Sequence, residues 1–150
     1  KEGLLAAVMS RVVQSNREDA ESGEVEWSGN LKKSLRRFAD DLYTKLVRDE
    51  AFIRTMVGEA GRHPDHSKKL IKDAVSPVRD RFIANLEAAR KAGLVRKGID
   101  LGIAADSFTA MLFGGMLRHT AGCSWGYDAE QFVATCVDLF AAGIASNPTK

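Results

Sequence analysis

Hydrophobic residues in the first third of the chain recur three and four positions apart, which is the spacing of one face of an α-helix. This pattern predicts an amphipathic helix over residues 4–13. It predicts a second helix over 31–46, for which Asn30 is a suitable N-terminal cap. A shorter third helix, capped by Asp49, is expected to carry Phe52, Ile53, Met56 and Val57 and to be broken at Gly61–Pro64. The first third of the chain is therefore expected to contain three helices.

The remainder of the chain keeps the helical period. A long helix is expected over Asp65–Ala92, with Pro77 near its middle. Proline removes one backbone hydrogen bond and clashes with the preceding turn, so we expect a kink there or a break into two helices. Gly93 then serves as the C-terminal cap, and two apolar helices follow, at Leu101–Gly122 and Asp128–Ser146. Because no strand pattern is present, the sequence predicts an all-α fold with one domain of about six helices.

The two C-terminal helices are apolar around almost their whole circumference, and Arg118 is the only charged residue between Asp106 and Asp128. A helix of this kind in a water-soluble protein needs cover on both sides, and one domain of this size offers a single core. We therefore expect an obligate dimer, in which the last two helices form a four-helix interface with a second copy. The alternative is that both helices pack entirely within one chain. The predicted interface residues are Phe113, Leu117, Phe132, Cys136, Leu139, Phe140 and Gly143.

The composition limits which partners the protein is expected to bind and in which cellular compartment we expect it. The 150 residues are 45% hydrophobic and 28% charged, and the net charge of +2 gives no electrostatic footprint for nucleic acid. The basic cluster at 32–37 is followed one turn later by acidic residues, which favours a solvated helix face over a DNA or membrane surface. Cys123 and Cys136 are too few for a disulfide framework or a zinc site, and they fit a reducing cytoplasm. No apolar stretch approaches the ~20 residues that span a bilayer, so we expect a cytoplasmic protein without a membrane partner.

Phenylalanine and methionine residues on the inward faces of these helices indicate a candidate pocket, because together they make an adaptable lining for apolar ligands. Stripes of this kind are also the normal way to pack helices, so the alternative for each residue is a place in an ordinary core. His119 shares the inward face and could orient a polar group of a ligand, or it could be a hydrogen-bonded core histidine. The candidate lining residues are Met9, Val12, Phe38, Leu42, Phe52, Met56, Val78, Phe82, Phe108, Met111, Leu112 and His119.

Residues that support catalysis or metal binding are not grouped in this sequence. There is no Ser/His/Asp grouping, no pair of inward carboxylates and no glycine-rich phosphate loop. His63 and His66 form a His-x-x-His pair, but Pro64 breaks the helix that would align them, and no third ligand is evident. We therefore expect no enzyme activity, no cofactor and no metal.

Several short motifs, taken in order, resemble those of one known family. Lys1–Leu5 resembles the junction at which the DNA-binding head of TetR-family transcription regulators joins their C-terminal domain. Glu59–Pro64 is similar to the Glu-Ala-x-Arg-x-Pro turn that ends a helix in that domain, and Ala92–Arg96 resembles the turn after the family's long central helix. Asp100 and Ala104–Ala105 follow as in the family, and the two closing helices match the pair that forms its dimer interface. The resemblance covers essentially the whole chain.

This resemblance implies that residues 1–150 are the C-terminal ligand-binding and dimerisation domain of a TetR-like repressor, and that the chain is part of a longer protein. The family's helix-turn-helix head lies outside the chain, so operator DNA would be bound only through that head. The implied partners are a second copy and a small apolar or aromatic effector, which releases the DNA by shifting a population. The alternatives are a small all-helical enzyme or carrier for an apolar compound, and an interaction module without a ligand.

Overall fold

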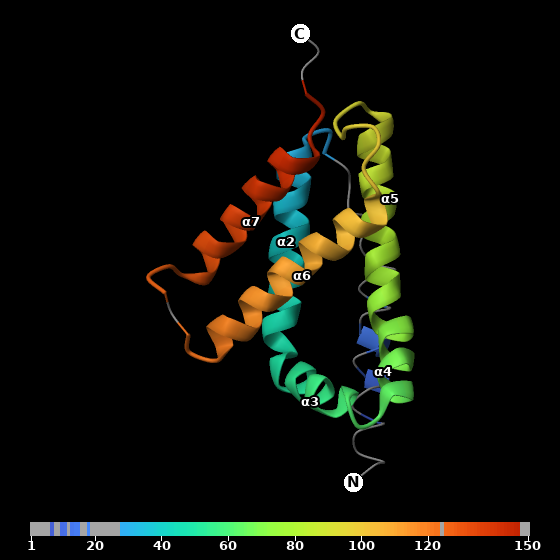
Figure 1. The fold of residues 1–150 in the computed structure, drawn as a ribbon, viewed down its shortest axis with the longest axis vertical. Coiled ribbons are helices and arrows are strands. Elements are labelled where there is room, and N and C mark those ends of the chain that lie inside the picture. Colours follow the sequence, from blue (N-terminus) through green and yellow to red (C-terminus); the bar gives the residue numbers. More distant parts are fainter. Residues whose placement is uncertain are drawn as a thin grey trace.

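The computed structural model describes residues 28–123 and 125–147, together with residues 7, 10, 11, 13–15 and 18. From residue 28 on, the described residues form six α-helices and one π-helical turn with no strand, and the described residues before it are helical as well, so the all-α prediction is confirmed. Figure 1 shows how these helices are arranged. The elements are α2 (Leu31–Arg48), α3 (Glu50–Ala60), α4 (Pro64–Leu70), η1 (Ile71–Val75), α5 (Ser76–Lys91), α6 (Leu101–Thr120) and α7 (Ala129–Ile144). None of the helices in these ranges combines the length and the apolar character needed to cross a bilayer.

Helix α2 begins where the sequence predicts. The Asn30 side chain accepts a hydrogen bond from the backbone N–H of Lys33 at 2.9 Å, which satisfies one of the free donors of the first turn. The residues of the apolar stripe then face the interior, including Leu35 and Phe38. On the outer face Arg36 pairs with Asp40 one turn later, at 2.8 Å, as the charge spacing predicts.

Helix α3 also begins at the predicted place, with Asp49 at its N-cap position, but the expected side-chain cap is not formed. Asp49 precedes α3, yet its side chain makes no capping hydrogen bond. Its carboxylate instead accepts two hydrogen bonds from the neighbouring guanidinium of Arg48, at 2.8 and 3.0 Å. A charged donor competes successfully with the backbone N–H groups, because hydrogen bonds to a guanidinium are the stronger kind.

The long helix predicted around Pro77 is one rod with a π-helical turn in it (Figure 1). Helix α4 leads into η1, and α5 then begins at Ser76 with Pro77 in its first turn. The backbone N–H of Ser76 bonds to the carbonyl of Ile71, five residues back, where an α-helix would reach back four. The wide turn lies directly before the proline ring, which would otherwise clash with the carbonyl four residues earlier. The expected kink is thus a local widening of the helix.

A turn at Gly93 ends the rod and ties it to the end of α7. Gly93 has a φ of 78°, which favours glycine, and the N–H of Leu94 bonds to the carbonyl of Ala89. Beyond this cap, an isolated antiparallel bridge joins Val95 to Ala145. Two main-chain hydrogen bonds of 2.9 Å flank this bridge. The C-terminal end of α7 is therefore fixed to the turn that follows α5.

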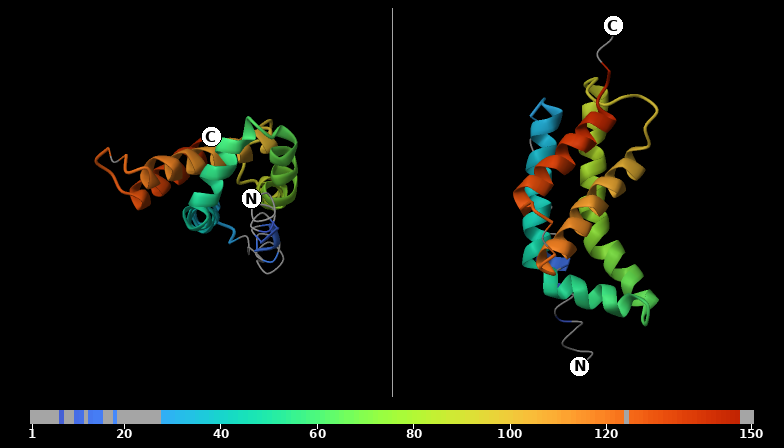
Figure 2. Two further views of the ribbon diagram at one scale, coloured as in Figure 1. Left: turned by 90° about the horizontal axis from the view of Figure 1, so that it is seen from below. Right: turned by 60° about the vertical axis from the view of Figure 1, so that its left-hand side comes forward.

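The helices form two layers (Figures 1 and 2). Helix α2 and the rod of α4, η1 and α5 follow the long axis of the molecule, and α3 joins them at one end. Helices α6 and α7 form a hairpin that crosses in front of them. In this hairpin α6 packs against both α2 and α5, while α7 packs against α2 and α6. The hairpin is therefore a layer with one side on the core.

Side-chain caps set the starts of both hairpin helices. Asp100 accepts a hydrogen bond from the N–H of Ile103 at the start of α6. Asp128 and Gln131 form a reciprocal capping box at the start of α7, in which each side chain bonds to the backbone of the other residue. The predicted cap at Asp128 is confirmed.

Helix α6 lies at the centre of the core, where Phe108, Leu112 and Met116 are completely buried. Two polar contacts fix α6 from outside. Arg79 of α5 donates two hydrogen bonds to Asp106, at 2.6 and 3.0 Å, and this lowers the pKa of the carboxyl. Arg54 of α3 donates to the carbonyl of Leu117 and to the hydroxyl of Thr120, each at 2.7 Å.

Gly115 allows the close packing of α6 on α7. A Cβ atom at this position would lie 2.0 Å from Cε1 of Phe132, which no real contact allows. The aromatic ring of Phe132 therefore occupies the space of the missing side chain. The glycine costs helix propensity, and the contact with the ring offsets that cost.

We expect Gly115→Ala to lower the free energy of unfolding by about 1–3 kcal/mol, because the added methyl group overpacks the contact with Phe132. Gly58→Ala is the matched control, since Gly58 lies in α3 with open space around it. That change is expected to stabilise the protein by roughly 0.5–1 kcal/mol through helix propensity. Urea unfolding followed by circular dichroism measures both. Equal stabilisation by the two substitutions would show that the ring moves aside without cost.

Candidate functional site

Three of the predicted pocket residues form a stack of aromatic rings. Phe38 of α2 and Phe82 of α5 are parallel, with ring centroids 3.9 Å apart and an interplanar angle of 5°. Phe108 of α6 lies 6.3 Å from the first ring and 5.7 Å from the second. Phe140 of α7, which was predicted to lie in the dimer interface, extends the stack at 4.4 Å from Phe108. Four helices thus meet at four rings.

Of the remaining predicted pocket residues, Leu112 belongs to the same hydrophobic cluster as these rings, and Leu42, Val78 and Met111 pack against it, whereas Phe52 and Met56 of α3 do not. Leu112 and Met56 are buried, whereas Leu42, Phe52, Val78 and Met111 are only partly buried. Met9 and Val12 lie outside the described residues. A centroid distance of 3.9 Å leaves no room between Phe38 and Phe82. A ligand would therefore separate these rings or lie beside them, along the partly buried side chains.

His119 is part of a polar and aromatic cluster at the end of α6. Its Nδ1 atom shares a hydrogen bond of 2.9 Å with the hydroxyl of Tyr43, a buried residue of α2. The rings of Tyr127 and Phe132 pack against its imidazole edge to face, at 5.8 and 5.6 Å. His119 is predicted from the sequence, whereas Tyr43 is not. Tyr43 follows the candidate residue Leu42 and continues the inward side of α2, which is the signal that could have found it.

Arg118 lies in the same cluster with an unusual environment. Its guanidinium carbon is 5.3 Å from the ring centroid of Trp125 and 5.2 Å from that of Phe132. Its Nε atom is buried and has no hydrogen-bond partner. Burial raises the pKa of the Tyr43 hydroxyl and of the Cys136 thiol, and the charge of Arg118 partly offsets both shifts.

The predicted interface residues divide between the inside and the outside of the hairpin. Leu139 and Gly143 are exposed on α7, with Leu139 exposed over 66% of its surface. Phe113, Leu117 and Phe132 are partly buried, and Cys136 and Phe140 are buried within the chain. The outer side of α6 carries Ile103, which is 67% exposed. The outer side of the hairpin therefore combines these two aliphatic residues with exposed polar residues, such as Thr135 and Asp138, and with small residues: Ala110 and Gly114 on α6, and Ala142 and Gly143 on α7.

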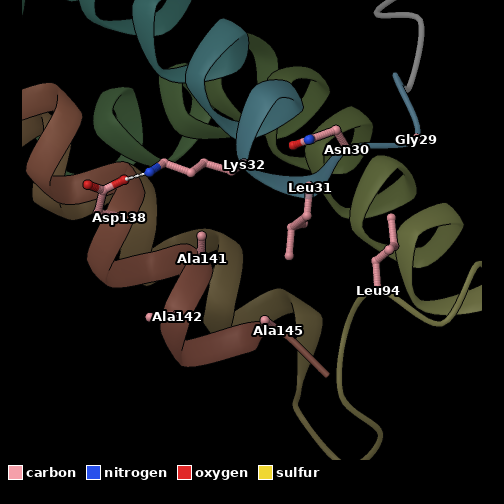
Figure 3. A pocket seen from close by; sticks show the side chains of 9 residues that line it. All are labelled: Gly29, Asn30, Leu31, Lys32, Leu94, Asp138, Ala141, Ala142 and Ala145. Carbon is pink, nitrogen blue, oxygen red and sulfur yellow. Dashed lines mark ion pairs between the residues drawn. The ribbon is translucent and has the colours of Figure 1, made fainter. Parts of the chain in front are cut away.

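A shallow hollow of roughly 490 Å³ opens at the other end of the hairpin (Figure 3). It lies where the start of α2 meets the end of α7 and the turn after α5. Lys32 and Asp138 form an ion pair of 2.7 Å at its edge. This hollow is not predictable from the sequence, because its walls come from three segments far apart in the chain. Its lining residues are Gly29, Asn30, Leu31, Lys32, Leu94, Asp138, Ala141, Ala142 and Ala145.

In the described part of the chain, no three His, Cys, Asp or Glu side chains lie close enough together to bind a metal ion. His63 is exposed beside Glu59, with Nε2 3.8 Å from a carboxylate oxygen. The side chain of His66 lies outside the described residues.

Comparisons with known proteins agree with this fold. The crystal structure of a protein from Mesorhizobium loti MAFF303099, assigned to the TetR family of transcriptional regulators, matches with a TM-score of 0.65. The match covers 96% of this chain and 73% of that chain at 16% sequence identity, which shows a common fold. No curated protein sequence matches the chain.

The sequence also matches a model of a protein family. The model of the C-terminal domain of AefR-like transcriptional repressors, a branch of the TetR family, matches residues 33–143. The family consists of regulators and not of enzymes, so the expectation of no enzyme activity is confirmed. Because the match covers well over half of the chain, this protein belongs to the TetR family, as the C-terminal domain of an AefR-like repressor.

Proposed function

We propose that this domain senses a small apolar or aromatic effector and dimerises, and that effector binding releases a separate DNA-binding head from its operator. The observation that carries the proposal is the uncovered outer side of the α6–α7 hairpin. Ile103 and Leu139 are each about two-thirds exposed there, at 67% and 66%. Exposed aliphatic side chains of this size beside alanines and glycines are typical of a face that another helix pair covers.

A second copy is the occupant that best fits this face. An interface built on a two-fold axis uses the same face on both partners, and a hairpin layer offers a flat pair of helices for that purpose. Ala110, Gly114, Ala142 and Gly143 would let the backbones of two hairpins approach closely. Cys136 and Phe140 are already packed inside the chain, so the proposed contact relies on Leu139, Gly143 and the outer side of α6.

Effector binding is proposed to act on the aromatic stack. A ligand that enters along Leu42, Val78 and Met111 would meet the edge of the contact between Phe38 and Phe82. Separating these rings moves α5 relative to α2, and α6 spans both helices. Such a change alters DNA release only if the ligand binds the released state more tightly than the DNA-competent state. The π-helical turn beside Val78 provides a place where the rod can adjust.

Leu139→Asp is expected to convert a dimer into a monomer, because a buried carboxylate without a partner is costly at an interface. The side chain is exposed in the single chain, so the fold itself does not depend on it. Light scattering after size-exclusion chromatography measures the mass. Ala84→Asp, at an exposed position of α5, is the matched control and should leave the dimer intact. A Leu139→Asp protein with the same mass as the wild type would contradict the proposed face.

Phe82→Ala is expected to lower the free energy of unfolding by about 3–5 kcal/mol and to abolish the stabilisation of the domain by effector-like compounds. The measurement is a thermal-shift screen of apolar and aromatic small molecules, followed by calorimetric titration of the compounds that stabilise the wild type. Ile144→Ala is the control, because Ile144 is buried at the far end of α7. It should cost about 2–5 kcal/mol without changing the affinity. Unchanged affinity in Phe82→Ala would assign Phe82 to the core alone.

A further inference from the structure

Arg118 is a half-buried cation that has no anion beside it among the residues the structure describes. None of its N–H donors forms a hydrogen bond or an ion pair within the described part of the chain, and the Nε atom is closed off from solvent. Its guanidinium makes cation–π contacts with Trp125 and Phe132, but these contacts provide no hydrogen-bond acceptor for its N–H groups. A buried donor of this kind lowers stability unless an acceptor reaches it.

Other half-buried arginines of this chain have the partner that Arg118 lacks. Arg36 pairs with Asp40 at 2.8 Å, and Arg79 pairs with Asp106 at 2.6 Å. In both cases a carboxylate of the same chain neutralises the guanidinium. A carboxylate of the same chain, as found beside Arg36 and Arg79, therefore does not explain the position of Arg118.

The polar groups next to Arg118 are a hydroxyl, an imidazole and a thiol. The hydroxyl of Tyr43 and the imidazole of His119 lie together, joined by their 2.9 Å hydrogen bond. The thiol of Cys136 is buried close enough to feel the charge of Arg118. No ion pair in the described ranges brings a carboxylate to Arg118, so one positive charge remains to be balanced. A monoanion balances it, whereas a phosphate dianion would need further cations.

The aromatic side chains around Arg118 indicate which kind of molecule would carry the anionic group. The rings of Tyr127 and Phe132 are stacked, with centroids 6.2 Å apart, and Trp125 is 65% exposed beside them. Aromatic side chains that flank a guanidinium offer flat surfaces on which another ring can stack. A flat apolar body and a carboxylate would therefore meet complementary groups in the same place.

We propose that Arg118 binds the carboxylate of an aromatic acid, with Trp125 and Phe132 contacting its ring and Tyr43 and His119 at its edge. The inference rests on the proposed effector-sensing function, and it names the chemical class of ligand that a site at this end of α6, separate from the contact between Phe38 and Phe82, would take. The guanidinium fork is shaped to accept two carboxylate oxygens side by side. Arg118 is then the residue that distinguishes an acid from a neutral compound of the same shape.

The test is calorimetric titration of the 150-residue chain with 2-naphthoate and with 2-naphthamide, which share a ring system and differ in charge. The wild type is expected to bind the naphthoate at least tenfold more tightly, since hydrogen bonds between charged groups are about twice as strong as neutral ones. Arg118→Gln should remove that preference. Arg96→Gln, which removes one positive charge at an exposed position, should keep it. Trp125→Ala changes an exposed residue, so it should fold normally and weaken naphthoate binding several-fold.

Equal affinity of the wild type for the two compounds, or an unchanged preference in Arg118→Gln, would overturn the inference. Loss of the dimer in Arg118→Gln with naphthoate binding intact would also overturn it, and would assign Arg118 to a carboxylate of a second copy. Stabilisation by neutral aromatic compounds alone would overturn the inference and leave effector sensing standing. If no compound binds and the chain is a dimer, effector sensing fails together with this inference.

Discussion

The contact among the four phenylalanine rings is the constraint on which the rest of the structure depends. Each ring comes from a different helix, and Phe108 of α6 touches the other three. The hairpin layer therefore contacts α5 through two rings, because Phe140 of α7 also lies 6.4 Å from Phe82, and it contacts α2 through Phe108. Aromatic stacking has a preferred geometry as well as a large buried area, so it fixes the orientation of these helices and not only their distance. Any change in the spacing of the rings must be accommodated by all four helices together.

Local rules account well for where the helices begin and end. Asn30 and Asp128 cap α2 and α7 because their side chains can reach the free N–H groups of the first turn. Gly93 adopts a positive φ that other residues avoid. These effects involve residues within four positions of each other, so the sequence alone is enough to find them. Asp49 shows the limit of this reasoning, because a neighbouring arginine took the carboxylate that the cap would have used.

The candidate site was less predictable, because it depends on contacts between distant residues. Hydrophobic period places Phe38 and Phe82 on inward faces, but it does not show that their rings lie parallel at 3.9 Å. Helix α7 is apolar nearly all round, so the sequence could not show which arc faces the core. The packing against α2 and α6 decides it, and it turns Phe140 inward while it leaves Leu139 outside. The contact of Gly115 with Phe132 is likewise invisible until the two helices are placed together.

The π-helical turn at Ile71–Val75 has a consequence for changes in the length of the chain. Inserting one residue into a regular α-helix rotates everything beyond it by about 100°, which would turn an inward face toward solvent. A turn that closes over five residues holds one residue more than its neighbours and absorbs that rotation. A relative with one residue fewer in this segment can form an unbroken α-helix there and present Phe82 to the same partners.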